Sequence, residues 1–122
     1  MSVHPALARL RAAALALPES EERLSHGQPT FFVAGKQFAQ FRDNHHGDQM
    51  TGVCVRTSGP DEQAMLIEAD PGLYSRPAYL GPSGWISINL APADTDWEHV
   101  ADWLAKSWQR AAPRRLVDKG GR

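Results

Sequence analysis

A tight turn followed by an alternating run constrains the fold of this 122-residue chain more than any other segment. The turn is Gly81-Pro82-Ser83-Gly84, and polar Ser87 and Asn89 then interrupt an otherwise apolar run over 85–90. Alternation of apolar and polar residues is typical of a strand that buries one face. The chain must therefore build a sheet and supply apolar elements that cover one side of it.

Two helical patterns can supply this cover. Residues 3–17 carry apolar side chains at three- and four-residue spacing, and Pro18 ends the pattern. Residues 94–111 carry a second stripe, for which Asp94 or Thr95 is the expected N-cap. Both helices are long enough to cross a small sheet.

The remaining segments complete an α+β order. Turn residues and β-branched or aromatic runs predict strands over 30–33, 37–42 and 50–56, a helix over 60–69, and short extended segments over 73–75 and 78–80. The order α-β-β-β-α-β-β-α, with hairpin-connected strands, predicts an antiparallel sheet packed against helices. We expect one domain over 1–117 and a flexible tail over 118–122.

Composition narrows the class of protein. The apolar and charged fractions, 42% and 22%, are ordinary for a globular domain, and the net charge is −1. Cys54 is the single cysteine, so a disulfide within the chain is impossible and a reducing compartment is expected. No stretch approaches the ~20 apolar residues of a membrane span. We therefore expect a cytoplasmic protein that does not enter the membrane.

One polar loop carries the residue types of a metal site. Asp43, His45, His46 and Asp48 lie close together in the sequence. Adjacent histidines on a strand would point to opposite faces, whereas zinc needs three or four convergent ligands. A solvated loop between two strands explains the same residues, so no metal site and no cofactor are predicted.

His26 is the centre of a possible pocket. It precedes a predicted strand, and a carboxylate such as Glu22 could orient its imidazole. If its loop packs beside the glycine turn, Tyr79 and Trp85 would join it. A structural histidine that hydrogen-bonds to loop backbone also explains the position, and it is the favoured interpretation. The sequence identifies no nucleophile, so no catalytic residue is assigned.

The end of the chain is basic. Six Lys or Arg residues lie between Lys106 and Arg122, against the single acid Asp118. Such segments can contact nucleic-acid phosphates without sequence preference. Cations also favour helix C-termini for purely local reasons. The basic segment is therefore compatible with weak nucleic-acid binding or with no binding at all.

Several short motifs, in this order and at this spacing, give the chain a resemblance to the MmcQ/YjbR family. They are Leu17-Pro18, Ser25-His26-Gly27-x-Pro29, Gly35-Lys36-x-Phe38-Ala39, Asp70-Pro71-Gly72, Pro77-Ala78-Tyr79-Leu80-Gly81, Gly84-Trp85-Ile86, Asp96-Trp97 and Ser107-Trp108.

The resemblance implies a fold similar to the frataxin-like (CyaY-like) sandwich, with hairpins that resemble paired wings. Family members are often labelled DNA-binding, which implies weak, non-specific contacts to DNA phosphates. Hairpin and C-terminal cations would make these contacts here, namely Lys36, Arg42, Arg110, Arg114 and Arg115. Two departures, Pro82-Ser83 and Val53-Cys54-Val55, stand where similar proteins often carry basic residues.

Three hypotheses for function follow. The first is a non-enzymatic binding domain with DNA as its partner. The second is a ligand-binding or enzymatic domain with a pocket near Glu22, His26, Tyr79 and Trp85. The third is a protein-interaction module that presents Trp103 or the sheet face. We expect a binding domain rather than an enzyme, as a monomer or a weak dimer.

Overall fold

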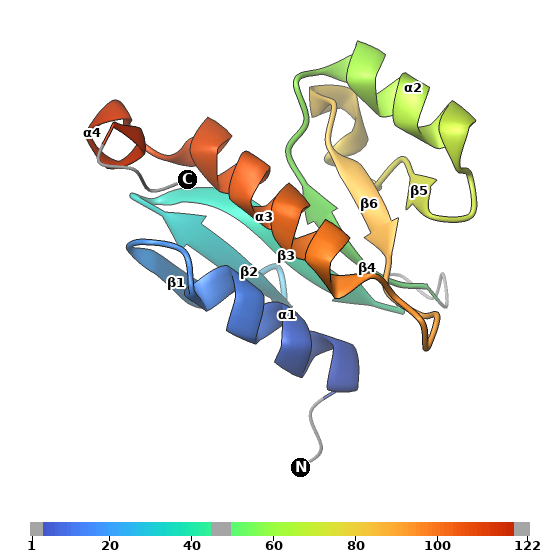
Figure 1. Cartoon of the computed structure of the whole chain (residues 1–122), viewed down its shortest axis with the longest axis horizontal. Helices are drawn as coiled ribbons and strands as arrows, with labels where there is room; N and C mark the ends of the chain where they lie inside the picture. Colours follow the sequence, from blue (N-terminus) through green and yellow to red (C-terminus); the bar gives the residue numbers. More distant parts are fainter. Residues whose placement is uncertain (1–3, 45–49, 119–122) are drawn as a thin grey trace.

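The computed structural model describes residues 4–44 and 50–118. Its centre is a six-stranded sheet in the order β1-β2-β3-β4-β6-β5, and every pair of neighbouring strands is antiparallel (Figure 1). The strands are β1 (Ser20–Ser25), β2 (Gln28–Val33), β3 (Lys36–Asp43), β4 (Thr51–Val55), β5 (Tyr74–Ser75) and β6 (Ile86–Asn89). The predicted antiparallel sheet packed against helices is confirmed.

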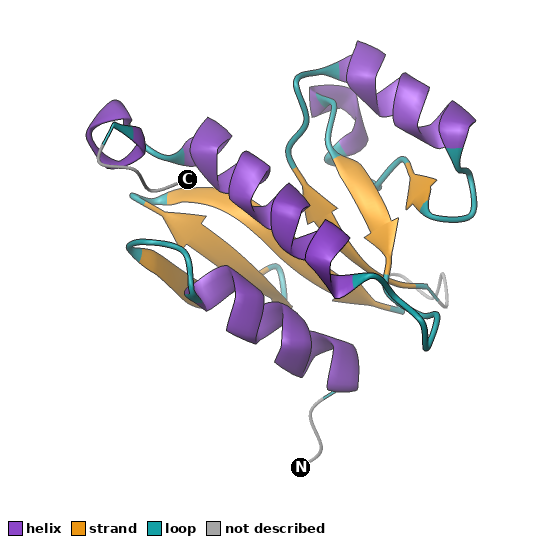
Figure 2. Cartoon of the chain, viewed as in Figure 1, coloured by secondary structure: helices purple, strands orange, loops and turns teal. Residues whose placement is uncertain are grey.

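The two longest helices lie over one face of the sheet (Figure 2). The helix α3 (Trp97–Ala111) crosses β3, and α1 (Pro5–Leu15) lies beside it near β1. The helix α2 (Pro60–Ala69) lies beside β5, and the short α4 (Arg114–Val117) follows α3. No helix among residues 4–44 and 50–118 is long and apolar enough to cross a membrane.

Apolar and polar residues alternate along the strands, so the sheet has an apolar face and a polar face. Phe31, Ala39, Val55 and Ile86 stand opposite one another on consecutive strands, and all four are fully buried. They pack with apolar residues of α1 and α3 that include Leu10, Leu104 and Trp108. The next row, Thr30, Gln40, Cys54 and Ser87, points to the opposite side. This opposite side is the open face of the sheet.

A β-bulge interrupts β3 at Phe38. The register passes from Phe31 opposite Ala39 to Phe32 opposite Gln37, so Phe38 has no opposite residue. The extra residue shifts the alternation, and Gln37 and Gln40 consequently share the open face although they are three positions apart. Without the bulge, one of these two side chains would point into the apolar core.

The element order differs from the sequence prediction at two points. No strand is predicted between the first helix and residue 30, but the segment Ser20–Ser25 forms β1. This edge strand pairs with β2 through its backbone and buries none of its side chains fully, so its sequence lacks apolar alternation. The single turn of α4 adds a helix after α3.

Two local predictions were wrong. Asp94 and Thr95 do not cap α3, because the carboxylate of Asp96 accepts the hydrogen bond from the backbone N–H of His99 at 3.1 Å. Residues 78–80 form a turn rather than an extended segment, and the 3-10 helix η2 (Gly81–Ser83) follows directly. Pro82 within η2 favours helical backbone angles at this point.

The turn Gly81-Pro82-Ser83-Gly84 is fixed from two sides. Gly84 has a φ of 89°, and a Cβ atom there would lie 2.8 Å from the Cα of Gly59. The buried side-chain amide of Gln63 on α2 donates to the carbonyl oxygens of Gly81 and Trp85. These contacts hold residues 81–85 against the start of α2.

Candidate functional site

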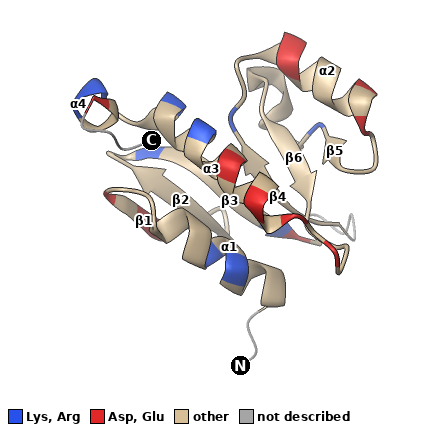
Figure 3. Ribbon diagram, viewed as in Figure 1, with Lys and Arg blue, Asp and Glu red and all other residues tan. Residues whose placement is uncertain are grey.

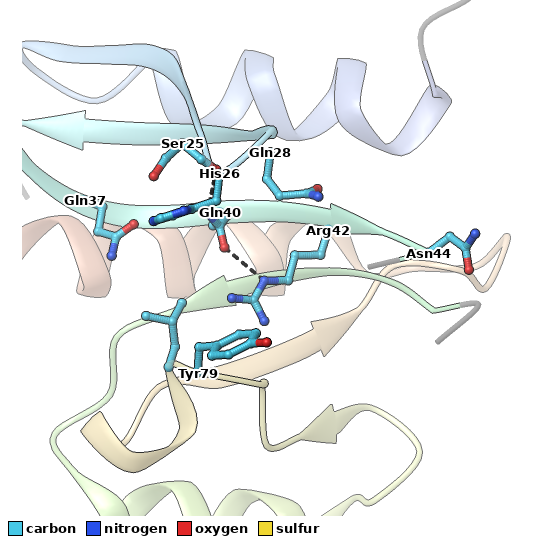
Figure 4. Close-up of a pocket in the computed structure, with 9 residues that line it drawn as sticks. Ser25, His26, Gln28, Gln37, Gln40, Arg42, Asn44 and Tyr79 are labelled. Carbon is cyan, nitrogen blue, oxygen red and sulfur yellow. Dashed lines mark hydrogen bonds between the residues drawn. The ribbon is translucent and has the colours of Figure 1, made fainter. Parts of the chain in front are cut away.

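The open face of the sheet carries a cavity of about 580 Å³ between the β1–β2 hairpin and residues 79–80. Most of its lining side chains are polar, and none is acidic (Figure 4). The nine residues that line it are Ser25, His26, Gln28, Gln37, Gln40, Arg42, Asn44, Tyr79 and Leu80. The cavity therefore joins segments that lie far apart in the sequence.

Arg42 is the one cation with a permanent charge in this lining. Its Nε donates to Oε1 of Gln40 at 2.9 Å, and its Nη1 donates to the carbonyl oxygen of Ala78 at 2.9 Å. These two bonds use two of the five N–H groups of the guanidinium. Figure 4 shows the side chain extending from β3 toward Tyr79. Arg42 is thus held in one orientation at the cavity wall.

The side chain of Gln40 fixes the orientation of the Arg42 guanidinium. This side chain is 4% exposed, and its Nε2 donates to Oγ1 of Thr30 at 3.1 Å and to the carbonyl oxygen of Ser25 at 3.4 Å. The hydroxyl of Thr30 in turn donates to the carbonyl oxygen of Gln28. A reversed amide would place its NH₂ against the Nε–H of Arg42. Only one amide orientation therefore satisfies the whole chain of bonds.

Amide side chains dominate the rest of the cavity. Gln28, Gln37 and Asn44 each carry one carbonyl acceptor and one NH₂ donor. The bulge at Phe38 is what brings Gln37 into this set. Tyr79 has a φ of 67° and is 76% exposed, so its ring stands at the rim. The lining can accordingly pair with a ligand that presents both donors and acceptors.

The structure separates the four residues of the predicted pocket. His26 and Tyr79 line the same cavity, with His26 exposed at the two-residue turn of the β1–β2 hairpin. Glu22 instead accepts two hydrogen bonds, 2.6 and 2.7 Å, from Arg11 on α1. Trp85 is 4% exposed and lines another hollow.

The five cations predicted to contact nucleic acid differ in their surroundings. Arg42 lies in the cavity, whereas Lys36 and Arg110 are exposed elsewhere. Arg114 pairs with Asp118 at 3.4 Å, and Arg115 pairs with Glu19 at 3.3 Å. Figure 3 shows cations on α4 and the C-terminal half of α3, and acids on the N-terminal half of α3. The basic end is therefore partly neutralised by its own neighbours.

The structure bears on one further expectation, and the residues of another lie largely outside the part that it describes. Trp103 is 5% exposed and carries Lys106 over its ring at 5.1 Å, so it does not present a surface for a protein partner. His45, His46 and Asp48 lie outside the described residues. Among residues 4–44 and 50–118, no group of three His, Cys, Asp or Glu side chains could hold a metal ion.

Sequence reasoning missed most of the cavity lining. Gln28, Gln40 and Arg42 share a face once the pairing of β2 with β3 is known, but the sequence does not specify this register. The place of Gln37 is even harder to predict, because the bulge breaks the alternation of core-facing and open-face residues along β3. The one available signal was the run of polar residues within strands whose alternate positions are apolar.

The comparisons with known proteins agree with this architecture. The YjbR family model matches residues 15–110. A crystal structure of Deinococcus radiodurans protein DR2400, with the family-model domain DUF419, aligns with a TM-score of 0.68 at 18% sequence identity. The alignment covers 93% of this chain and 80% of that one, and at this identity it supports the fold alone. No curated protein matches the chain.

Proposed function

The chain belongs to the YjbR family, and we propose that it is a binding domain for a small anion that also carries amide-type hydrogen-bonding groups. The ligand would occupy the cavity on the open face of the sheet. The cavity's size falls within the range of pockets that hold small molecules.

One observation carries the proposal. Arg42 is fixed at the cavity wall by Gln40 and Ala78, and no lining residue is acidic. A guanidinium held in this way is prepared to bind a carboxylate or a phosphate, because little side-chain freedom remains to be lost on binding. The charge of Arg42 thus favours an anionic group near Tyr79.

The amide lining defines the rest of the ligand. Buried donors and acceptors must find partners once water is displaced, so a purely apolar ligand would leave Gln28 and Gln37 unpaired. A ligand with its own amide, or with a planar ring that carries similar groups, satisfies them. Such a planar group would lie next to the ring of Tyr79, which is exposed at the rim.

Backbone NMR shifts during a titration test this proposal. N-acetylglycine combines a carboxylate with an amide, and uridine 5′-monophosphate combines a phosphate with a planar imide. Each is added to about 10 mM, tenfold above a Kd of about 1 mM. We expect saturable shifts confined to residues 25–28, 37–42 and 78–80 for at least one probe. Shifts in none of these segments with either probe would refute the proposal.

Nucleic-acid binding is a second candidate. It is supported by Lys36 and Arg110, which are exposed and make no ion pair with any residue of 4–44 or 50–118. Arg114 and Arg115 contribute less, since each already has an acidic partner. In this account Arg42 serves the cavity rather than a duplex.

Fluorescence anisotropy with labelled duplex DNA tests this candidate. At about 50 mM salt the electrostatic contribution is strong, and affinity must fall steeply as salt rises. The double variant Lys36→Gln/Arg110→Gln should bind more weakly than Arg114→Gln/Arg115→Gln. Absence of binding at about 50 mM salt rejects the candidate and leaves the cavity proposal untouched.

A further inference from the structure

We propose a second anion site, which takes a phosphate group, between the end of β4, the η2 turn and the C-terminal end of α3. A hollow of about 280 Å³ lies there, many times the ~30 Å³ of a water molecule in the liquid. Its lining consists of Arg56, Thr57, Ser83, Trp85 and Arg110, and none of these is acidic. It shares no lining residue with the cavity of Arg42.

Arg56 is held in place at this hollow. Its backbone N–H donates to Oγ of Ser107 at 2.8 Å, and its Nε donates to the carbonyl oxygen of Gln37 at 2.9 Å. Its guanidinium carbon lies 5.0 Å from the centroid of the Trp85 ring. The Nε–H is thus engaged and the aromatic ring lies beside the guanidinium, which leaves its Nη groups for a bidentate phosphate contact.

The charge of Arg56 is not balanced. The arginines at positions 11, 23, 114 and 115 each pair with a carboxylate within 4 Å, but Arg56 and Arg110 pair with none among residues 4–44 and 50–118. Arg56 is also half-buried. Burial lowers the pKa of Arg56, because the charged form loses solvation and no carboxylate offsets the loss. A bound anion would supply the missing counter-charge.

A local effect explains the position of Arg56 and another that of Arg110, but neither explains why the two side chains line the same hollow. Arg110 lies in the last turn of α3, where the helix dipole favours a positive charge. Arg56 gains a cation–π contact from Trp85. Neither effect requires both guanidinium groups to line one hollow with the exposed hydroxyl of Ser83. The Thr57 hydroxyl donates to the carbonyl oxygen of Gly84 at 2.6 Å, so Thr57 shapes the wall.

A titration with pyrophosphate tests the site, with sodium chloride added to a parallel sample at matched ionic strength. The readouts are the indole N–H of Trp85, assigned with Trp85→Phe, and the Nε–H of Arg56. We expect both signals to shift saturably with pyrophosphate and not with chloride. Arg110→Gln should weaken the apparent affinity about tenfold, as expected for a hydrogen bond between charged groups, and Ser83→Ala should weaken it less. Both residues are exposed, so the fold should persist.

The source of the phosphate is settled by a second arm with a short DNA duplex. Saturation by pyrophosphate identifies a small phosphate ligand, and saturation by the duplex alone identifies a nucleic-acid backbone. Shifts that match the chloride control in both arms overturn the proposal, as does unchanged affinity in Arg110→Gln. Arg42→Lys should retain the pyrophosphate response, so the outcome here is independent of the cavity on the open face.

Discussion

The hydroxyl of Ser107 on α3 donates a 2.5 Å hydrogen bond to the carbonyl oxygen of Phe38, the extra residue in the bulge of β3. The same hydroxyl accepts a bond from the backbone N–H of Arg56, which lies just beyond β4. One buried side chain thus satisfies two backbone groups that the sheet leaves unpaired. The bulge places Gln37 in the cavity, so this contact links the helix layer to the open face.

We predict that Ser107→Ala destabilises the fold by about 1–3 kcal/mol, because it leaves a buried carbonyl and a buried N–H without their partner. Urea unfolding measures the change in the free energy of unfolding. Ser83→Ala is the matched control. Because Ser83 is exposed, this substitution should lower the free energy of unfolding by less than about 0.5 kcal/mol. Equal stability of the two variants would contradict the role given to Ser107.

The turn before β6 yields a paired prediction on two glycines. Gly84 and Gly27 both have positive φ, 89° and 77°, but only at Gly84 would a Cβ atom approach backbone, 2.7 Å from the carbonyl carbon of Gly59. Gly27→Ala should therefore lower the free energy of unfolding by about 1–2 kcal/mol, because alanine disfavours the left-handed backbone conformation at this position. Gly84→Ala should cost clearly more, and thermal unfolding of the two variants compares them. A smaller loss for Gly84→Ala would be inconsistent with the packing described.

The helices and central strands could be predicted from the sequence because their apolar residues recur with a regular period. Val53, Val55, Ile86 and Ile88 alternate with polar or small residues, and this period is what places them on the buried face. Gly35, between the strands predicted over 30–33 and 37–42, has a φ of 81°, a backbone conformation that glycine accepts readily. β1 was not predictable in the same way, since an edge strand needs only backbone pairing and carries no apolar alternation.

The candidate site was less predictable, because it depends on relations between strands. His26 and Tyr79 were expected to meet, and they line one cavity. Arg42 was assigned to a surface hairpin, and only the register of β3 places it beside Gln40 on the open face. The likeness to the CyaY fold stays an expectation from the resemblance.

Glu22 provides a prediction that separates stability from binding. The hydrogen bond from Arg11 to Glu22 raises the pKa of Arg11 in the folded state, so the stabilisation from the charged guanidinium is lost as the pH rises above the ordinary pKa of arginine. Both side chains are partly exposed, so Glu22→Gln should cost only about 0.5–1 kcal/mol. The variant should bind N-acetylglycine as the wild type does. A large loss of binding would mean that Glu22 acts in the cavity.

Gln40 is predicted to be a positioning residue for Arg42. Gln40→Leu removes the acceptor of the Arg42 Nε–H and the donor to Thr30, so the guanidinium gains freedom. We expect N-acetylglycine to bind several-fold more weakly, while the neutral analogue N-acetylglycinamide changes little. Gln28→Leu is the control, because it removes an amide without touching Arg42 and should weaken both probes alike. Equal effects on both probes in Gln40→Leu would remove the positioning role.

The most direct measurement is the affinity of Arg42→Gln for the charged and the neutral probe, compared with wild type by NMR titration. The account predicts that N-acetylglycine binds about tenfold or more weakly to the variant, the loss expected for a hydrogen bond to a charged group. N-acetylglycinamide should bind both proteins equally, and Arg42→Lys should recover part of the preference for the anion. Unchanged affinity of Arg42→Gln for N-acetylglycine, in a variant that unfolds at the wild-type temperature, would contradict the proposal that Arg42 makes this cavity an anion site.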